Sequence, residues 1–370
     1  MNNSMNQKIK VLICDDSAIL RRLTKEALMA YKEMQVIGEA ANGRDALDFI
    51  ERTKPDVVLL DVEMPVMDGV DALRNIRKRF GKLPVIMFSS ITTGRQSEAT
   101  IDALEAGAND FVAKPSSVGS LQTALQHVGK DLREKILAIT KRSTPPSRLS
   151  AKPRGLPGGG FIKAKDVTIQ IVGIGSSTGG PAALAKVVKS LKANLPVPIL
   201  ITQHMPASFI KPLADRLSNV GSYKVRPAVN NEPLKPGTIL IAPGDFHLRL
   251  KRQDKQVLTF LENSPPVNSC RPAIDPMFDS IAECYGRHSL AVVLTGMGRD
   301  GCDGAQTIKN RGGIVFSQDE KSCVVYGMPR EVADAGLSDR VLPIDQIGPE
   351  ISSFANTPAA ALAGSSALNN

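Results

Sequence analysis

Residues 171–181 read IVGIGSSTGGP, and this stretch decides how the second half of the chain folds. An apolar run passes into glycines and hydroxyls, and a proline and a helix-like pattern follow. A buried strand that turns sharply into a helix produces such a pattern, which is typical of parallel α/β sheets. In these sheets the loops after the strands gather at one edge, where ligands bind and chemistry occurs. The turn therefore either cradles a phosphate group or presents a nucleophile.

The spacing of the glycines in this turn separates the two possibilities. A dinucleotide-binding loop needs G-x-G-x-x-G, but Thr178 stands where the third glycine should be. The next strand ends in Gln203 and His204 instead of the acidic residue that binds a ribose. The same letters satisfy G-x-S-x-G with Ser177 at the centre, a turn that lifts a hydroxyl out of a sheet. A nucleophile is therefore favoured, and a nucleotide-dependent oxidoreductase is the weaker alternative.

Short β-branched runs alternate with amphipathic stretches in both halves of the chain. This alternation predicts an α/β fold with two domains, the first doubly wound and flavodoxin-like, the second mostly parallel with an antiparallel addition. The predicted strands of the first half are 10–14, 35–40, 56–61, 84–89 and 110–114. In the second half the predicted parallel strands are 168–175, 198–203 and 290–296, and the antiparallel addition is 238–243, 247–251 and 256–262.

A basic segment rich in proline, glycine and serine separates the two halves. Residues 131–165 carry nine basic and two acidic side chains, whereas residues 1–130 carry 17 of each. Most of the net charge of +9 therefore lies in a connector, and with no tryptophan and 4% aromatic residues the chain offers little for stacking on nucleic-acid bases. We predict a first domain, a linker, a second domain and a flexible tail at 1–128, 129–165, 166–352 and 353–370.

The composition also indicates where the protein works. The chain starts with a polar segment and not with a signal peptide, and no apolar run approaches the roughly 18 residues that a membrane span needs. The five cysteines are scattered and form no CxxC pair, which is typical of reduced thiols. We therefore expect a cytoplasmic protein that inserts into no membrane and binds no nucleic acid.

Acidic side chains mark the strand ends of the first half. Asp15 and Asp16 end the first predicted strand, Asp61 ends the third, Ser89 the fourth and Lys114 the fifth. Three neighbouring carboxylates repel one another unless a hard cation lies among them, and Mg²⁺ suits such an oxygen set. A lysine and a hydroxyl at the same edge would complete a site for a transferred phosphoryl group.

A base and an acid for Ser177 stand at the corresponding edge of the second sheet. Of the four histidines, His204 is the one that ends a predicted parallel strand on the same edge as Ser177. Asp300 follows the strand 290–296 and reaches that edge too. An imidazole between a hydroxyl and a carboxylate is the arrangement that activates serine. We predict a Ser177–His204–Asp300 triad, whose chemistry needs no metal.

The first half resembles the response-regulator receiver domain over about residues 8–128. The resemblance is carried by CDDS (14–17), LDVEMPVMDG (60–69), FSS (88–90) and AKP (113–115). It implies that Asp61 is the phosphoacceptor, that a chemotaxis histidine kinase or a small acyl phosphate is the donor, and that Ser89 and Lys114 sense the phosphoryl group. It also implies a magnesium site formed by Asp15, Asp16, Asp61 and the backbone carbonyl of Glu63.

The second half is similar to the chemotaxis protein-glutamate methylesterases over about residues 166–350. The matching segments are GIGSSTGGP, TQHMP, APGDFH, NSPPVNSCRPAIDPMF, LTGMGRDG and SCVVYGMPRE. The family implies a phosphorylation-regulated enzyme that hydrolyses glutamate methyl esters on methyl-accepting chemoreceptors, releases methanol, and deamidates selected glutamines. The chain order Ser, His, Asp differs from that of the α/β-hydrolases, so the G-x-S-x-G turn does not place the chain in that superfamily.

The resemblance adds two residues to the predicted site and contains one departure. It implies that Thr178 and the backbone of Met297 orient the site and hold the oxyanion. Ser176 stands where the family pattern predicts alanine, so two serines are adjacent, and the choice of Ser177 depends on the motif spacing. The alternative function is a response regulator with a non-catalytic or DNA-binding output, but residues 166–350 show neither a strand-free pattern nor a basic charge.

Overall fold

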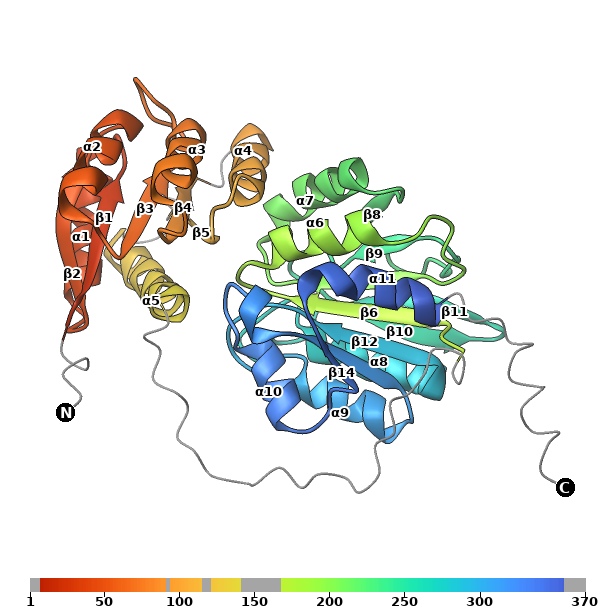
Figure 1. Cartoon of the computed structure of the whole chain (residues 1–370). Helices are drawn as coiled ribbons and strands as arrows, with labels where there is room; N and C mark the ends of the chain where they lie inside the picture. Colours follow the sequence, from red (N-terminus) through yellow and green to blue (C-terminus); the bar gives the residue numbers. More distant parts are fainter. Residues whose placement is uncertain (1–6, 91–93, 115–120, 141–167, 356–370) are drawn as a thin grey trace, which may run out of the picture. The chain divides into compact units, whose positions relative to one another are not determined.

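The strands predicted for the first half form one five-stranded sheet in the computed structural model (Figure 1). The structure describes residues 7–90, 94–114, 121–140 and 168–355. Residues 141–165 of the predicted linker and 356–370 of the predicted tail lie outside the described residues. The chain divides into two units, within 1–146 and 147–370, and each unit is described by itself.

The sheet of the first unit has the order β2-β1-β3-β4-β5, with every neighbouring pair parallel. Its strands are β1 (Ile9–Cys14), β2 (Met34–Ala40), β3 (Val57–Asp61), β4 (Val85–Ser89) and β5 (Asp110–Ala113). Its helices are α1 (Ala18–Met29), α2 (Gly43–Thr53), α3 (Gly69–Phe80), α4 (Gly94–Glu105) and α5 (Leu121–Ile139). Helix α1 packs with α5, and α3 packs with α2 and α4, which is the predicted doubly wound arrangement.

Helix α5 extends the first unit beyond the predicted boundary. The helix continues to Ile139, past residue 128, where the linker was predicted to begin. Leu132 and Ile136 are completely buried. Residues four apart lie on the same face of a helix. The charged residues between Leu132 and Ile136 made this segment look like part of the basic linker. The segment just after residue 128 therefore belongs to the core of the first unit.

The second unit contains a seven-stranded parallel sheet in the order β14-β13-β12-β6-β7-β9-β8 and a separate antiparallel pair, β10-β11. The strands are β6 (Ile171–Ser176), β7 (Ile199–Gln203), β8 (Val225–Pro227), β9 (Ile239–Ile241), β10 (His247–Gln253), β11 (Gln256–Glu262), β12 (Ser289–Val293), β13 (Ile314–Gln318) and β14 (Arg340–Leu342). The helices are α6 (Gly180–Ser190), α7 (Ala207–Val220), α8 (Ile274–Tyr285), α9 (Cys302–Asn310), α10 (Met328–Asp334) and α11 (Ile344–Ala355). In Figure 1, α6, α7 and α11 cover one face of this sheet, and α8, α9 and α10 cover the other. No helix in the described ranges is long and apolar enough to cross a membrane.

Strand β9 corrects one prediction. The segment 238–243 was expected in the antiparallel addition, but its residues Ile239–Ile241 lie parallel between β7 and β8 in the main sheet. All three residues are buried. A strand covered on both faces shows a continuous apolar run, so its sequence does not reveal the direction of its neighbours.

Two glycines in β6 bring helix α8 close to the sheet. A Cβ atom on Gly175 would lie 2.6 Å from a side-chain carbon of Ile274, and one on Gly173 would lie 2.7 Å from Ile281. Both contacts are shorter than real carbon atoms allow, so larger residues would push the helix away. The glycines of residues 171–181 thus have a packing role, and they hold the first turn of α8 beside the carboxyl ends of β6 and β12.

Candidate functional site

The predicted acidic site of the first unit is assembled at the carboxyl edge of its sheet. Asp61 is the last residue of β3, Asp15 follows β1 directly, and Lys114 follows β5. The Nζ atom of Lys114 lies 2.7 Å from Oδ2 of Asp15 and 2.7 Å from Oδ2 of Asp61. All three side chains are buried. The ammonium group of Lys114 therefore bridges the carboxylates of Asp15 and Asp61, which would otherwise repel each other.

The same edge offers oxygen ligands to a metal ion. Carboxylate oxygens of Asp15, Asp16 and Asp61 lie within 4.8 Å of one another, and Asp16 is exposed to solvent. Hard cations such as Mg²⁺ prefer oxygen sets of this kind, so the residues fit the predicted ion. Burial raises the pKa of Asp61 to about 6, against the opposing charge of Lys114. A second cation beside Asp61 would favour its ionised form further.

The other two predicted residues of this unit differ in exposure. Ser89 is completely buried at the end of β4, and its hydroxyl accepts a hydrogen bond of 2.7 Å from Thr100 on α4. Glu63 is exposed, and its carboxylate accepts a hydrogen bond from Gln96. Thr100 was not predicted, because a threonine within a helix carries no sequence signal of a contact with a strand end.

The two adjacent serines of the second unit have different environments. Ser176 is the last residue of β6 and is completely buried, and its hydroxyl donates a hydrogen bond of 2.6 Å to Oε1 of Gln203. Ser177 is partly exposed, and its hydroxyl makes no hydrogen bond with another described residue. The Nε2 group of Gln203 donates to the backbone carbonyls of Ser177 and His204, 3.0 Å from each. Ser176 therefore supports the turn, and Ser177 presents a free hydroxyl.

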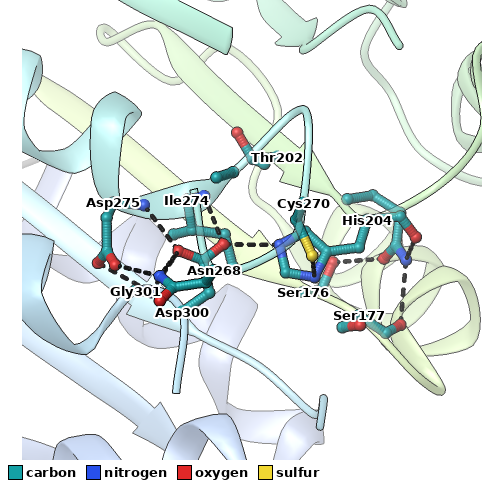
Figure 2. A network of polar contacts seen from close by, with 12 residues as sticks. Ser176, Ser177, Thr202, His204, Asn268, Cys270, Ile274, Asp275, Asp300 and Gly301 are labelled. Atoms are coloured by element: carbon teal, nitrogen blue, oxygen red, sulfur yellow. Dashed lines mark hydrogen bonds and ion pairs between the residues drawn. The ribbon is translucent and has the colours of Figure 1, made fainter. Parts of the chain in front are cut away.

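His204 and Asp300 form an ion pair at the same edge (Figure 2). His204 follows β7, and its backbone N–H donates to the carbonyl of Ser176. Its Nε2 atom lies 2.7 Å from Oδ2 of Asp300, in the loop between β12 and α9. The strand order places β6 between β12 and β7, so the three predicted triad residues follow three adjacent strands. Segments far apart in the chain thus reach the same edge of the sheet.

Asp300 is held by a set of donors that sequence analysis missed. Its Oδ2 accepts from the backbone of Ile274, and its Oδ1 accepts from the backbones of Asp275 and Gly301 and from the side chain of Asn268. Burial alone would raise the pKa of Asp300, but the hydrogen bond and charge of His204, followed by these donors, lower it to about 2. The carboxylate therefore stays ionised at any ordinary pH.

The pKa of His204 responds to both of its ring contacts. Burial alone would lower it, but the hydrogen bonds to Asp300 and to the thiol of Cys270, together with their charges, raise it to about 9. The Sγ atom of Cys270 lies 3.4 Å from Nδ1, the nitrogen that Asp300 leaves open. Both contacts therefore favour the protonated form of the imidazole. Cys270 and Asn268 were not predicted, because they belong to a loop and follow no parallel strand.

The remaining predicted residues surround the turn. Thr178 is buried, and its carbonyl accepts a hydrogen bond from the hydroxyl of Thr295. Met297 is partly exposed, and its backbone N–H donates to no other described residue. A Cβ atom on Gly296 would lie 2.8 Å from the Cβ of Ser177, so the loop that carries Met297 passes directly beside the serine.

Comparison with known proteins gives the same division of the chain. Residues 11–126 match the response regulator receiver domain, and residues 172–351 match the CheB methylesterase. A protein-glutamate methylesterase/protein-glutamine glutaminase from a Nocardioides species is 43% identical over 356 residues, which are 93% of this chain and 94% of that protein. The protein of the same name from Thermotoga maritima is 42% identical over 339 residues, 92% of this chain and 96% of that protein.

A solved structure agrees with these relationships. The catalytic domain of the Thermotoga maritima CheB methylesterase is 46% identical with a TM-score of 0.50, and the match covers 51% of this chain and 100% of that one. The comparisons favour the methylesterase interpretation over a non-catalytic or DNA-binding output. Since the relatives match both units over nearly the full length, the chain belongs to the family of receiver-containing protein-glutamate methylesterases/protein-glutamine glutaminases.

Proposed function

We propose that the second unit hydrolyses glutamate methyl esters on cytoplasmic segments of chemoreceptors, with Ser177 as nucleophile, His204 as base and Asp300 as the group that orients the base. The observation that carries this assignment is the contact of 2.7 Å between Nε2 of His204 and Oδ2 of Asp300, at the sheet edge where Ser177 follows the adjacent strand β6. With Nε2 committed to the carboxylate, Nδ1 is the nitrogen that serves Ser177. The contact between His204 and Asp300 therefore supports the half of the triad that orients the base.

The reaction begins when Nδ1 of His204 takes the hydroxyl proton of Ser177. The serine oxygen attacks the ester carbonyl, and the tetrahedral oxyanion accepts a hydrogen bond from the Met297 N–H, which donates to no other described residue. His204 returns the proton to the leaving methanol, and it then deprotonates the water that hydrolyses the acyl-enzyme. A glutamine side chain follows the same steps with ammonia as the leaving group.

The raised pKa of His204 sets the condition for the first step. A base whose pKa is about 9 holds its proton at neutral pH, so only a small fraction of the free enzyme can accept the proton of Ser177. The ionised Asp300 stabilises the imidazolium that forms at each transfer. The contact with Asp300 thus stabilises the imidazolium form of His204, and it lowers the fraction of free enzyme whose His204 is neutral and able to act as a base.

The first unit is proposed to regulate this activity through phosphorylation of Asp61 by a histidine kinase. Asp15, Asp16 and Asp61, with the backbone carbonyl of Glu63, would hold Mg²⁺. When bound, the ion would neutralise charge on the incoming phosphoryl group. Lys114 already contacts Asp15 and Asp61 through Nζ, so it supplies positive charge at the same point. Ser89 lies at the end of the neighbouring strand β4, where its hydroxyl would contact the phosphoryl oxygens.

The test is release of methanol from methylated chemoreceptors in membrane vesicles by the full chain. The purified protein is assayed alone, with Mg²⁺, and with Mg²⁺ plus a small acyl phosphate. We expect methanol release in all three samples and faster release in the third. Ser177→Ala is the matched control, because it removes one partly exposed hydroxyl that makes no hydrogen bond with another described residue. Methanol release by Ser177→Ala at the wild-type rate would remove the assignment of the nucleophile.

A further inference from the structure

Cys270 is held against the site by a tight turn. The backbone N–H groups of Val267 and Cys270 each donate to the carbonyl of the other residue, at 3.1 and 2.9 Å. The two residues between them, Asn268 and Ser269, have φ angles of +49° and +63°. Two successive positive φ angles inside such a pair are the pattern of a type I′ turn, which has one well-defined backbone conformation. The backbone position of Cys270 is therefore well defined.

The His204 ring contacts the Cys270 thiol on one side and Asp300 on the other. The three groups can therefore act as nucleophile (Cys270), base (His204) and orienting acid (Asp300). Sγ of Cys270 lies 3.4 Å from Nδ1 of His204, and Nε2 of the same ring lies 2.7 Å from Asp300 (Figure 2). A thiol next to an imidazole that a carboxylate orients is the arrangement that produces a reactive thiolate. Cys270 is also partly exposed, so a small reagent reaches it. Ser177 and Cys270 thus share one base.

The other cysteines of the chain have environments that keep the thiol protonated. Burial raises the pKa of Cys14, of Cys284 and of Cys302, and it raises that of Cys323 to about 12. None of these four sulfur atoms has a histidine nitrogen as hydrogen-bond partner among the described residues. A raised pKa slows the reaction of a thiol, because the thiolate is the reacting species. The other four cysteines therefore serve as internal controls for Cys270.

We infer that Cys270 is a modification site, whose reaction with small disulfides of the glutathione class reversibly blocks His204. In molecules whose His204 is neutral, the Cys270 thiol passes its proton to Nδ1, and the thiolate attacks one sulfur of the disulfide. A bond forms between Sγ and that sulfur while the original S–S bond breaks. The other half leaves as a thiolate and takes up the proton, so Cys270 is oxidised to the mixed disulfide and one half of the reagent is reduced to a thiol.

The consequence for ester hydrolysis rests on the proposed function of Ser177 and His204. Nδ1 is the nitrogen that would accept the serine proton, since Asp300 occupies Nε2. A group attached to Cys270 is bonded to an atom 3.4 Å from Nδ1, so it crowds the nitrogen that must accept the serine proton. A reducing thiol reverses the exchange and restores access. The protein would then lose receptor demethylation under oxidising conditions without a change in fold.

The reactivity of the thiol is tested first, without any esterase assay. The folded full chain is treated with limiting iodoacetamide at neutral pH, and the rate of labelling is measured for each cysteine by peptide mass mapping. We expect Cys270 to react at least about tenfold faster than Cys284 and Cys323, which are also partly exposed. We expect His204→Gln to slow Cys270 and to leave the rates of the other two unchanged. Equal rates for the three cysteines in the wild-type chain would overturn the inference.

The switch is tested by comparing methanol release before and after incubation with glutathione disulfide. Wild type should lose about tenfold or more of its rate and regain it with dithiothreitol, whereas the ratio for Cys270→Ser should stay within about twofold of one. Cys284→Ser is the matched control and should be inhibited like wild type. Equal inhibition of Cys270→Ser would refute the inference. If no sample releases methanol, the proposed function fails, and the labelling rates still decide the reactivity of Cys270.

Discussion

Exchanging the two adjacent serines for alanine, one at a time, should separate catalysis from stability. The Ser177 hydroxyl is partly exposed and unpaired, so Ser177→Ala should change the free energy of unfolding by less than about 0.5 kcal/mol. The same substitution removes the proposed nucleophile, and the rate of methanol release should fall by on the order of 10⁶-fold. The fold should survive a change that abolishes activity.

Ser176→Ala should show the reverse behaviour. The buried hydroxyl of Ser176 donates to Oε1 of Gln203 at 2.6 Å, and its loss leaves that oxygen without the partner. An unpaired buried polar atom costs about 1–3 kcal/mol, and each kcal/mol lowers the melting temperature of a domain of this size by roughly 2–4 °C. Gln203 keeps its hydrogen bonds to the carbonyls of Ser177 and His204, so the rate should fall by less than about 10²-fold.

The assay combines thermal unfolding, followed by circular dichroism, with methanol release from the same methylated receptor preparation. Each variant is measured as the full chain at one pH and one protein concentration. A stable, inactive Ser177→Ala beside a less stable, active Ser176→Ala is the expected result. An inactive Ser176→Ala together with an active Ser177→Ala would mean that the nucleophile is Ser176 and that the reasoning from exposure and hydrogen bonding is wrong.

Three further predictions concern the charged residues. Because only neutral His204 can accept a proton and its pKa is raised to about 9, kcat/KM should rise with pH between 7 and about 9; a flat profile would exclude His204 as the base. Asp300→Asn should lower kcat by about 10⁴-fold. It should also destabilise the unit, because the new NH₂ group would face N–H donors that bond to the carboxylate in the wild type. A rate within about tenfold of wild type would remove Asp300 from the triad. Asp61→Asn should abolish both incorporation of labelled phosphate and acceleration by acyl phosphate with Mg²⁺, and acceleration that persists in this variant would place the phosphoacceptor elsewhere.

The groups that end parallel strands were predictable from the sequence. Asp61, His204 and Ser177 stand at or directly after a short apolar run, and carboxyl ends of parallel strands meet at one edge whatever the strand order. The fold class followed from the same alternation, and it is confirmed. The direction of β9 was predicted wrongly, because a strand of three buried residues carries no alternation that distinguishes its neighbours.

The residues that tune the site could not be found in this way. Asn268 and Cys270 lie in a turn that follows the antiparallel strand β11, and Asp275 lies in the first turn of α8, where an acidic residue is ordinary helix capping. Asp275 reaches Asp300 because the glycines of β6 let α8 approach the sheet. Such contacts depend on the packing distance between a helix and a strand, which no local pattern expresses.

The packing of α8 also decides which of two buried carboxyl groups carries the charge. Burial and the neighbouring charge of Asp300 raise the pKa of Asp275 to about 7, although Gly301, Gly304 and Asn268 all donate to it. Asp300 accepts from a cation as well as from backbone donors, so it stays ionised while Asp275 takes up a proton as the pH falls through about 7. Above that pH the Asp275 carboxylate adds a second negative charge next to Asp300, and this charge favours the protonated form of His204. The ionisation of Asp275 therefore opposes the release of the proton from His204, and the alkaline rise in activity should be shallower than that of an isolated imidazole.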